Sequence, residues 1–149
     1  MNNYKLKPYL GGAILGCSDS QCKQWREEVK KIFPKAIDPM RRDYRGKESQ
    51  NFEKIVELDK KDIEDSDCLL VNYQGPSAGT CMEILYAWER GLPVYIVTSK
   101  NVLISPWVKY HSSRFYYSFE DAFVYLRKFE QAIALVEESI KMLDEVRGK

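Results

Sequence analysis

Short apolar runs alternate with amphipathic stretches along most of this chain. Within the amphipathic stretches, apolar residues recur every three or four positions, which is the spacing of one helix face. The expected helices are residues 20–33, 51–66, 78–91 and 119–146, and the expected strands are residues 9–15 with their exit loop, 35–40, 67–73, 92–98 and 115–117. Strands that alternate with helices in this way predict βαβ units and a parallel sheet.

Nothing in the pattern divides the chain into two domains. Its 149 residues suit one core, and no internal repeat, low-complexity tract or linker interrupts residues 1–149. We therefore expect a doubly wound α/β fold, with a parallel sheet of about five strands flanked by helices. Ligands of such folds bind at the carboxyl ends of the strands. That rule selects the candidate site segments, which are residues 9–12, 38–45, 72–83 and the chain from residue 98 onward.

Composition narrows the kind of function. A net charge of +1 gives no reason to expect a nucleic-acid polymer or a membrane surface as a partner. The 4 cysteines form no C-x-x-C pair and His111 is the single histidine, so we expect no metal site. Sparse, unpatterned cysteines favour a reducing cytoplasm over a disulfide framework.

One carboxylate, Glu83, lies within the otherwise apolar helix expected at residues 78–91. This helix follows the turn GPSAGT, residues 75–80, whose small side chains let a ligand approach the backbone. Free N–H groups at a helix start favour anions, including a phosphate. The pattern alone leaves two interpretations open: Glu83 acts as a nucleophile, or it only benefits from the helix dipole.

Three segments together resemble the nucleoside 2-deoxyribosyltransferase family: YLGGAI (9–14), DIEDSDCLLVNY (62–73) and PSAGTCMEILYAWERGLPVYIV (76–97). The similarity extends over roughly residues 8 to 127. It implies a flavodoxin-like fold and homo-oligomers with active sites shared between subunits. The implied reaction exchanges the base of a 2-deoxyribonucleoside through a covalent deoxyribosyl-glutamate intermediate. The implied partners are small nucleosides or nucleotides and free nucleobases, with no cofactor.

The resemblance assigns catalytic roles to three residues. Glu83 matches the glutamate that attacks C1′ of the sugar, and a carboxylate suits this step because it captures an oxocarbenium-like centre as a sugar ester. Tyr9 matches a tyrosine that positions the glutamate. Asp59 matches an aspartate that contacts the base and assists proton transfer to it. Ordinary strand packing of Tyr9 and a solvated helix face for Asp59 are the alternatives.

Ser77 departs from the pattern, because the transferases usually carry an aspartate there that holds the sugar hydroxyls. A serine resembles the related 5′-monophosphate N-glycosidases, since a hydroxyl at a helix start can donate to a phosphate. Those hydrolases also tend to carry a serine or arginine after the first strand, where this chain has Ala13, Ile14 and Leu15. A transferase is the leading hypothesis, a monophosphate N-glycosidase the alternative, and a non-catalytic nucleotide-binding domain the third.

Further residues are expected around the substrate. Gly11 and Gly79 provide close approach to the backbone. The charged loop after residue 38 offers Arg41, Arg42 and Asp43 for the base or a phosphate, unless it is simply solvated. Ser105 and Trp107 lie in the region that the family contributes to a neighbouring subunit, although packing is the alternative for Trp107. The apolar stripe of residues 119–146 is longer than one small sheet needs, which suggests contact with another subunit.

Overall fold

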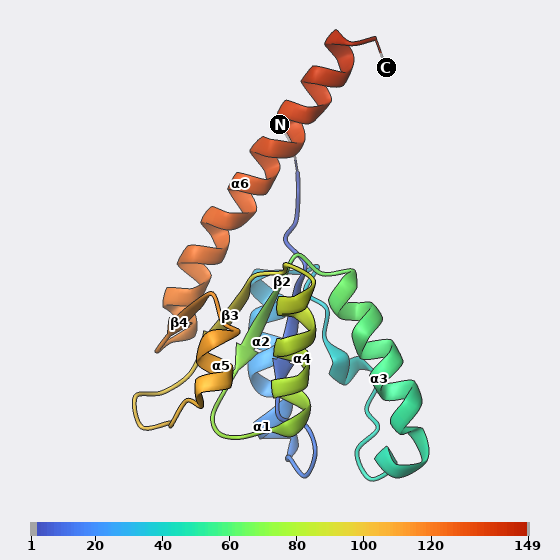
Figure 1. Cartoon of the computed structure of the whole chain (residues 1–149), viewed down its shortest axis with the longest axis vertical. Coiled ribbons are helices and arrows are strands. Elements are labelled where there is room, and N and C mark those ends of the chain that lie inside the picture. Colours follow the sequence, from blue (N-terminus) through green and yellow to red (C-terminus); the bar gives the residue numbers. More distant parts are fainter. Residues whose placement is uncertain (1–2, 149) are drawn as a thin grey trace.

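A four-stranded parallel sheet lies between two layers of helices in the computed structural model, which describes residues 3–148 (Figure 1). The strands lie side by side in the order β1 (Pro8–Gly12), β2 (Cys68–Asn72), β3 (Val94–Val97) and β4 (Arg114–Tyr116). The helices are α1 (Asp19–Cys22), α2 (Gln24–Ile32), α3 (Glu48–Glu64), α4 (Ala78–Glu89), α5 (Pro106–Tyr110) and α6 (Phe119–Val146), with a short 3₁₀ helix η1 (Pro39–Arg41). The doubly wound α/β fold expected from the sequence is confirmed.

The expected strand at residues 35–40 is reduced to a single bridge, in which Ile37 pairs in parallel with Tyr9. The sheet therefore has four strands rather than about five. The strand ends early because the Asp38 carboxylate accepts a hydrogen bond from the N–H of Met40 and begins η1, while Pro39 has no N–H to give to a ladder. With Ile37 on the outer side of β1, the spatial order is that of a flavodoxin-type sheet.

The helix expected at residues 20–33 is broken at Lys23 into α1 and α2. Ser18 caps α1, because its hydroxyl accepts from the N–H of Gln21. At the break, the carbonyl of Cys22 accepts a hydrogen bond from the side chain of Arg26. This contact brings a buried arginine behind the end of β1.

The core has two halves, one on each face of the sheet. Leu10, Leu70 and Val97 face α2 and α6, whereas Leu69, Val71 and Ile96 face α3, α4 and α5. This alternation along each strand is the period of two that a β-strand imposes. Both faces are covered, which is why the strands read as continuous apolar runs in the sequence.

The apolar stripe of α6 extends beyond the sheet. Ala122 and Leu126 are buried against it, whereas Val136, Ile140 and Leu143 are exposed on the half of the helix that projects away from the domain (Figure 1). Among residues 3–148, none of the helices combines the length and apolar character required to cross a membrane.

Candidate active site

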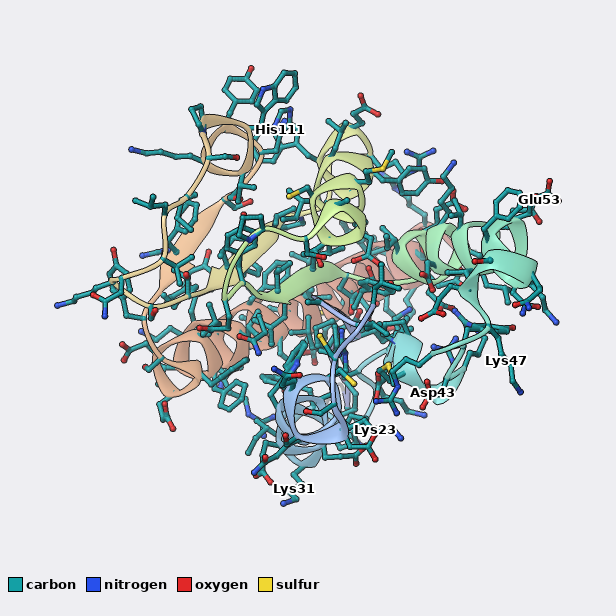
Figure 2. All side chains as sticks on the ribbon, turned by 90° about the horizontal axis from the view of Figure 1, so that it is seen from below. Lys23, Lys31, Asp43, Lys47, Glu53 and His111 are labelled. Atoms are coloured by element: carbon teal, nitrogen blue, oxygen red, sulfur yellow. The ribbon has the colours of Figure 1, made fainter. Side chains whose placement is uncertain are left out.

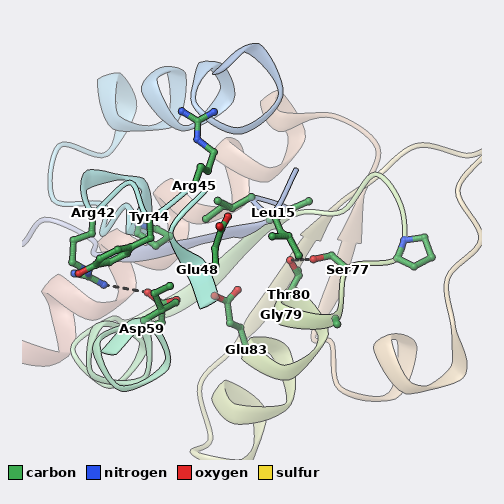
Figure 3. Close-up of a pocket in the computed structure, with 17 residues that line it drawn as sticks. Leu15, Arg42, Tyr44, Arg45, Glu48, Asp59, Ser77, Gly79, Thr80 and Glu83 are labelled. Carbon is green, nitrogen blue, oxygen red and sulfur yellow. Dashed lines mark hydrogen bonds and ion pairs between the residues drawn. The ribbon is translucent and has the colours of Figure 1, made fainter. Parts of the chain in front are cut away.

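A cavity of about 440 Å³ opens at the carboxyl ends of β1 and β2 (Figure 3). This is the switch point at which doubly wound sheets bind ligands. Its walls are the loop after β1, η1 and the loop between η1 and α3, the first three turns of α3, and the first two turns of α4. The residues named in Figure 3 are Leu15, Arg42, Tyr44, Arg45, Glu48, Asp59, Ser77, Gly79, Thr80 and Glu83.

Glu83 lines this cavity, and a residue of β1 binds its carboxylate. The Tyr9 hydroxyl, completely buried, donates a hydrogen bond of 2.8 Å to Oε1 of Glu83. The second carboxylate oxygen passes close to Gly11, where a Cβ atom would lie 3.5 Å from Oε2 and 3.3 Å from Val71. Gly11 thus leaves room for the carboxylate between the strand and the cavity, which a branched side chain would fill.

The environment of Glu83 strongly favours its protonated form. Burial raises the pKa of Glu83 to about 8, the Tyr9 hydrogen bond works against this, Asp59 raises the pKa further and Arg26 lowers it. Burial also raises the pKa of Tyr9 well above its usual range, so Tyr9 remains a donor. A carboxyl group with so perturbed a pKa, in a cavity, is typical of catalytic acids, bases and nucleophiles.

Arg26 lies behind this pair and is 0% exposed. Its guanidinium donates to the carbonyls of Leu10 (3.2 Å) and Gly12 (3.1 Å) and lies 3.6 Å from Oδ1 of Asp38. It therefore fixes the end of β1, the strand from which the Tyr9 side chain reaches Glu83. Sequence analysis missed Arg26, because its position in an amphipathic helix resembles that of an exposed charge.

Asp59 lies on the cavity wall formed by α3 and is bound by Arg42, the residue that directly follows η1. Nη2 of Arg42 donates to Oδ1 of Asp59 (3.1 Å) and to Oδ2 of Asp62 (2.6 Å), and Nη2 of Arg41 donates to Oδ1 of Asp62 (2.7 Å). Burial raises the pKa of Asp59, and Arg42 offsets only part of the effect. Figure 3 shows the Arg42–Asp59 contact as a dashed line. Asp59 is thus a half-buried, paired acid and not part of a solvated face.

The start of α4 forms the opposite side of the cavity. The hydroxyl of Thr80 donates to that of Ser77 (3.0 Å), and the Ser77 carbonyl accepts from the N–H of Cys81. As at any helix start, the N–H groups before Cys81 have no carbonyl one turn earlier to bind. With Gly79 among them, this segment is suited to an anionic or hydroxylated part of a ligand.

Some expected site residues lie outside the cavity. Arg41 pairs with Asp62, and Asp43 binds Arg45 at 2.7 Å on the outer surface. Ser105 caps α5 by accepting from the N–H of Val108, and Trp107, 73% exposed, stacks on His111. Figure 2 places His111 and Asp43 far apart on the molecule. In a single chain these residues form no common site with Glu83, and their roles remain predictions.

Among the polar residues that line the cavity, sequence analysis did not single out Tyr44, Arg45 and Glu48. Arg45 donates to the Cys17 carbonyl (3.0 Å) and to Asp19 (2.5 Å), and so joins the loop before α3 to the loop after β1. Tyr44 and Arg45 fall in segment 38–45, which was selected because ligands bind at the carboxyl ends of the strands. Nothing else in the sequence marked these two residues as part of a site. Glu48 begins α3, and its side chain carries no sequence signal beyond the usual acid in a first turn.

Possible metal ligands do not converge in this structure. Across residues 3–148, no three histidine, cysteine, aspartate or glutamate side chains are arranged to hold an ion. Cys17, Cys22, Cys68 and Cys81 are all free thiols.

This chain is similar to known proteins both in sequence and in fold. The family model described as nucleoside 2-deoxyribosyltransferase matches residues 9–142. A search of curated proteins finds no match.

Solved structures of low sequence identity share the fold. A 2-deoxyribosyltransferase from Bacillus psychrosaccharolyticus superposes with a TM-score of 0.62 at 16% identity, over 78% of this chain and 90% of that one. A conserved protein from Enterococcus faecalis V583 gives 0.63 at 16%, over 82% and 98%. The CMP N-glycosidase BcmB from Clostridium botulinum gives 0.54 at 15%, over 80% and 98%.

Proposed function

The chain belongs to the nucleoside 2-deoxyribosyltransferase family, and from this premise we propose that it exchanges the base of 2-deoxyribonucleosides through a deoxyribosyl ester of Glu83. The observation that carries the proposal is the Tyr9–Glu83 hydrogen bond at the cavity floor, with Asp59 on the adjoining wall. A nucleophile, a group that orients it and a proton carrier are the parts that this glycoside chemistry needs.

The first half-reaction starts from the ionised fraction of Glu83, which has released its proton to solvent. An oxygen of this carboxylate forms a bond to C1′ as the bond from C1′ to the base nitrogen breaks. The bond's electron pair leaves with the base, and Asp59 supplies the proton that neutralises it. Tyr9 keeps the glutamate in place, because its hydroxyl donates to Oε1 and leaves Oε2 toward Gly11 and the cavity. The sugar is then held as an ester.

In the second half-reaction, a nitrogen of the incoming base attacks C1′ and the Glu83 carboxylate leaves. Asp59 takes up the proton that the new base releases, which returns both acids to their starting state. Two displacements at C1′ retain its configuration. Water in place of the second base would give hydrolysis, so the same residues serve either outcome.

A 5′-monophosphate N-glycosidase is the second candidate, and the start of α4 favours it. Ser77, Thr80 and the free N–H groups of this turn are suited to a phosphate. The charges nearby favour a neutral substrate instead. Arg42 is paired with two aspartates and Arg45 with Asp43 and Asp19, so the positive charge of each guanidinium is already balanced by carboxylates. We therefore rank the nucleoside first.

We further propose that the protein forms a homo-oligomer whose subunits share active sites, and that it acts in the cytoplasm. The cavity continues into a groove between α3 and α4. The cavity and the groove share four lining residues: Ile55, Asp59, Gly79 and Glu83. The groove is flanked by exposed Met82, next to the exposed Trp107 of α5. Apolar and aromatic side chains of this kind are typical of the centre of an interface, so a second copy is expected to cover this side of the site.

A two-donor assay tests the function. The protein is incubated with adenine and either deoxyinosine or its 5′-monophosphate, and the products are separated by chromatography. We expect deoxyadenosine to form from the nucleoside. Hypoxanthine released only from the monophosphate, with no exchanged product, would identify a nucleotide hydrolase. Binding without turnover of either donor would contradict an enzyme and support the nucleotide-binding domain.

Tyr9→Phe should make Glu83 harder to ionise. The Tyr9 hydrogen bond lowers the pKa of Glu83, so its removal raises that pKa above about 8. The test uses a 2-deoxyribonucleoside whose purine is methylated at N7, because this base leaves as a neutral molecule without a proton from Asp59. With this N7-methylated donor, activity should rise with pH, and the midpoint in Tyr9→Phe should lie about one pH unit higher than in the wild type.

Tyr4→Phe serves as the matched control, because Tyr4 also has a raised pKa but lies outside the cavity. An unchanged midpoint in Tyr9→Phe would show that Tyr9 contributes only strand packing.

A further inference from the structure

Two acids and two arginines form a continuous chain beside the cavity, in the order Asp59, Arg42, Asp62 and Arg41. Asp59 and Asp62 lie one turn apart on α3, so both point toward the loop after η1. Asp38 caps η1, which fixes where the two arginines leave the backbone. Asp62 is 8% exposed and lies outside the cavity, so it has no contact with a substrate there.

Asp62 and Asp59 compete for the same nitrogen of Arg42. The contact to Asp62 is 2.6 Å and the contact to Asp59 is 3.1 Å, so Asp62 takes the larger share of that guanidinium's charge. An aspartate that pairs alone with an arginine has a lowered pKa and therefore stays ionised. Asp59 shares Arg42 with Asp62, so the guanidinium lowers the pKa of Asp59 less. Arg42 contacts Oδ1 of Asp59, which leaves Oδ2 available to a ligand in the cavity.

We propose that Asp62 is a positioning residue which, through Arg42, keeps Asp59 able to carry the proton to and from the base. The role follows only if Asp59 moves a proton as in the proposed function. In that step the Asp59 O–H proton goes to the base nitrogen while the electron pair of the broken bond to C1′ goes to the same atom. Arg42 then pairs with the Asp59 carboxylate that the transfer leaves. Asp62 weakens this ion pair, because it binds the same nitrogen of Arg42.

The other groups around Asp59 do not change in the variants below. Those on the surrounding elements and along the cavity and groove are Tyr9, Tyr44, Arg45, Glu48, Lys60, Glu83, Tyr86 and Glu89. Glu83 lies on another element, and the charge of Asp59 already contributes to its raised pKa. Shifts that depend on Asp62 and Arg42 can therefore be separated from this constant background.

The test is the pH dependence of kcat/KM for release of hypoxanthine from deoxyinosine. The apparent pKa of Asp59 is identified as the one missing from the profile of Asp59→Asn. Asp62→Asn gives Arg42 to Asp59 alone, so this apparent pKa should fall by about one pH unit. Arg42→Gln removes the cation, so it should rise. Arg41→Gln should raise it less, and because Arg41 is the most exposed member of the chain, this variant keeps the fold.

Opposite shifts in Asp62→Asn and Arg42→Gln support the proposal, and shifts absent or in the same direction would overturn it. With the N7-methylated donor, which needs no proton, the shifts should vanish; if they persisted, Asp62 would act on the fold and not on Asp59. Arg90→Gln, at an exposed arginine paired with Glu64, is the control. Failure of the function itself would appear differently, as activity that survives in Glu83→Gln.

Discussion

Glu83→Gln is expected to reduce base exchange by at least about 10⁴-fold, because an amide oxygen cannot form the sugar ester through which the reaction is proposed to pass. The substitution keeps the shape of the side chain and can still accept the Tyr9 hydrogen bond. The loss should therefore appear in kcat and not in protein folding. Exchange between deoxyinosine and adenine, followed by chromatography, measures it.

The same substitution should stabilise the protein at alkaline pH. The pKa of Glu83 is about 8 in the folded protein and near its ordinary value in the unfolded chain, so the folded state holds a proton that the unfolded state has already released. Stability from this group therefore falls as pH rises between those two values. At pH 9 glutamine removes this penalty, whereas at pH 4 it changes little, and each 1 kcal/mol recovered raises Tm by about 2–4 °C.

Glu53→Gln is the matched control, because Glu53 is an exposed acid on the neighbouring helix α3 and lines neither the cavity nor the groove. It should retain full exchange and show no pH-dependent gain in Tm. A large fall in Tm in Glu83→Gln, or retained activity, would instead mean that Glu83 serves only the structure of α4.

Asp59→Asn is expected to slow release of an unmodified base by about 10²–10⁴-fold, the range that a positioned proton carrier contributes. Asparagine is similar in size and can still bind Arg42, but it cannot carry the proton. The N7-methylated donor should react at close to the wild-type rate, because its base leaves without one. Initial rates with both donors, at the same pH, measure the difference.

Glu57→Gln provides the control for that experiment, since Glu57 is an exposed acid on α3 two residues from Asp59. If Asp59→Asn slowed both donors equally, Asp59 would contribute to binding or folding and not to proton transfer. If each donor reacted at the same rate in the variant as in the wild type, Asp59 would have no part in catalysis.

The sequence by itself determined the class of fold. Apolar runs with a period of two and stripes with a period of 3.6 are local, so the strands at residues 67–73 and 92–98 and the helix at 78–91 could be recognised without contacts. The carboxyl-end rule then selected three segments that contribute to the cavity, residues 9–12, 38–45 and 72–83, whereas the fourth, from residue 98 onward, contributes none of its lining. The strand at residues 35–40 failed as a full strand because Asp38 and Pro39 favour the turn of η1, and a single bridge satisfies the backbone before it.

The tertiary structure alone decided which charged residues act together. Asp59, Asp62, Arg41 and Arg42 are ordinary charges in the sequence, and only the packing of η1 against α3 makes them a chain of ion pairs. Arg26 is similar, because its burial depends on carbonyls at the end of β1 that are distant in sequence. The physical reason is the range over which each effect acts along the chain. The periodicity of a helix or strand is set by neighbouring residues. Desolvation and charge pairing, which set the pKa values of Glu83 and Asp59, depend on residues distant in sequence that the fold brings beside them.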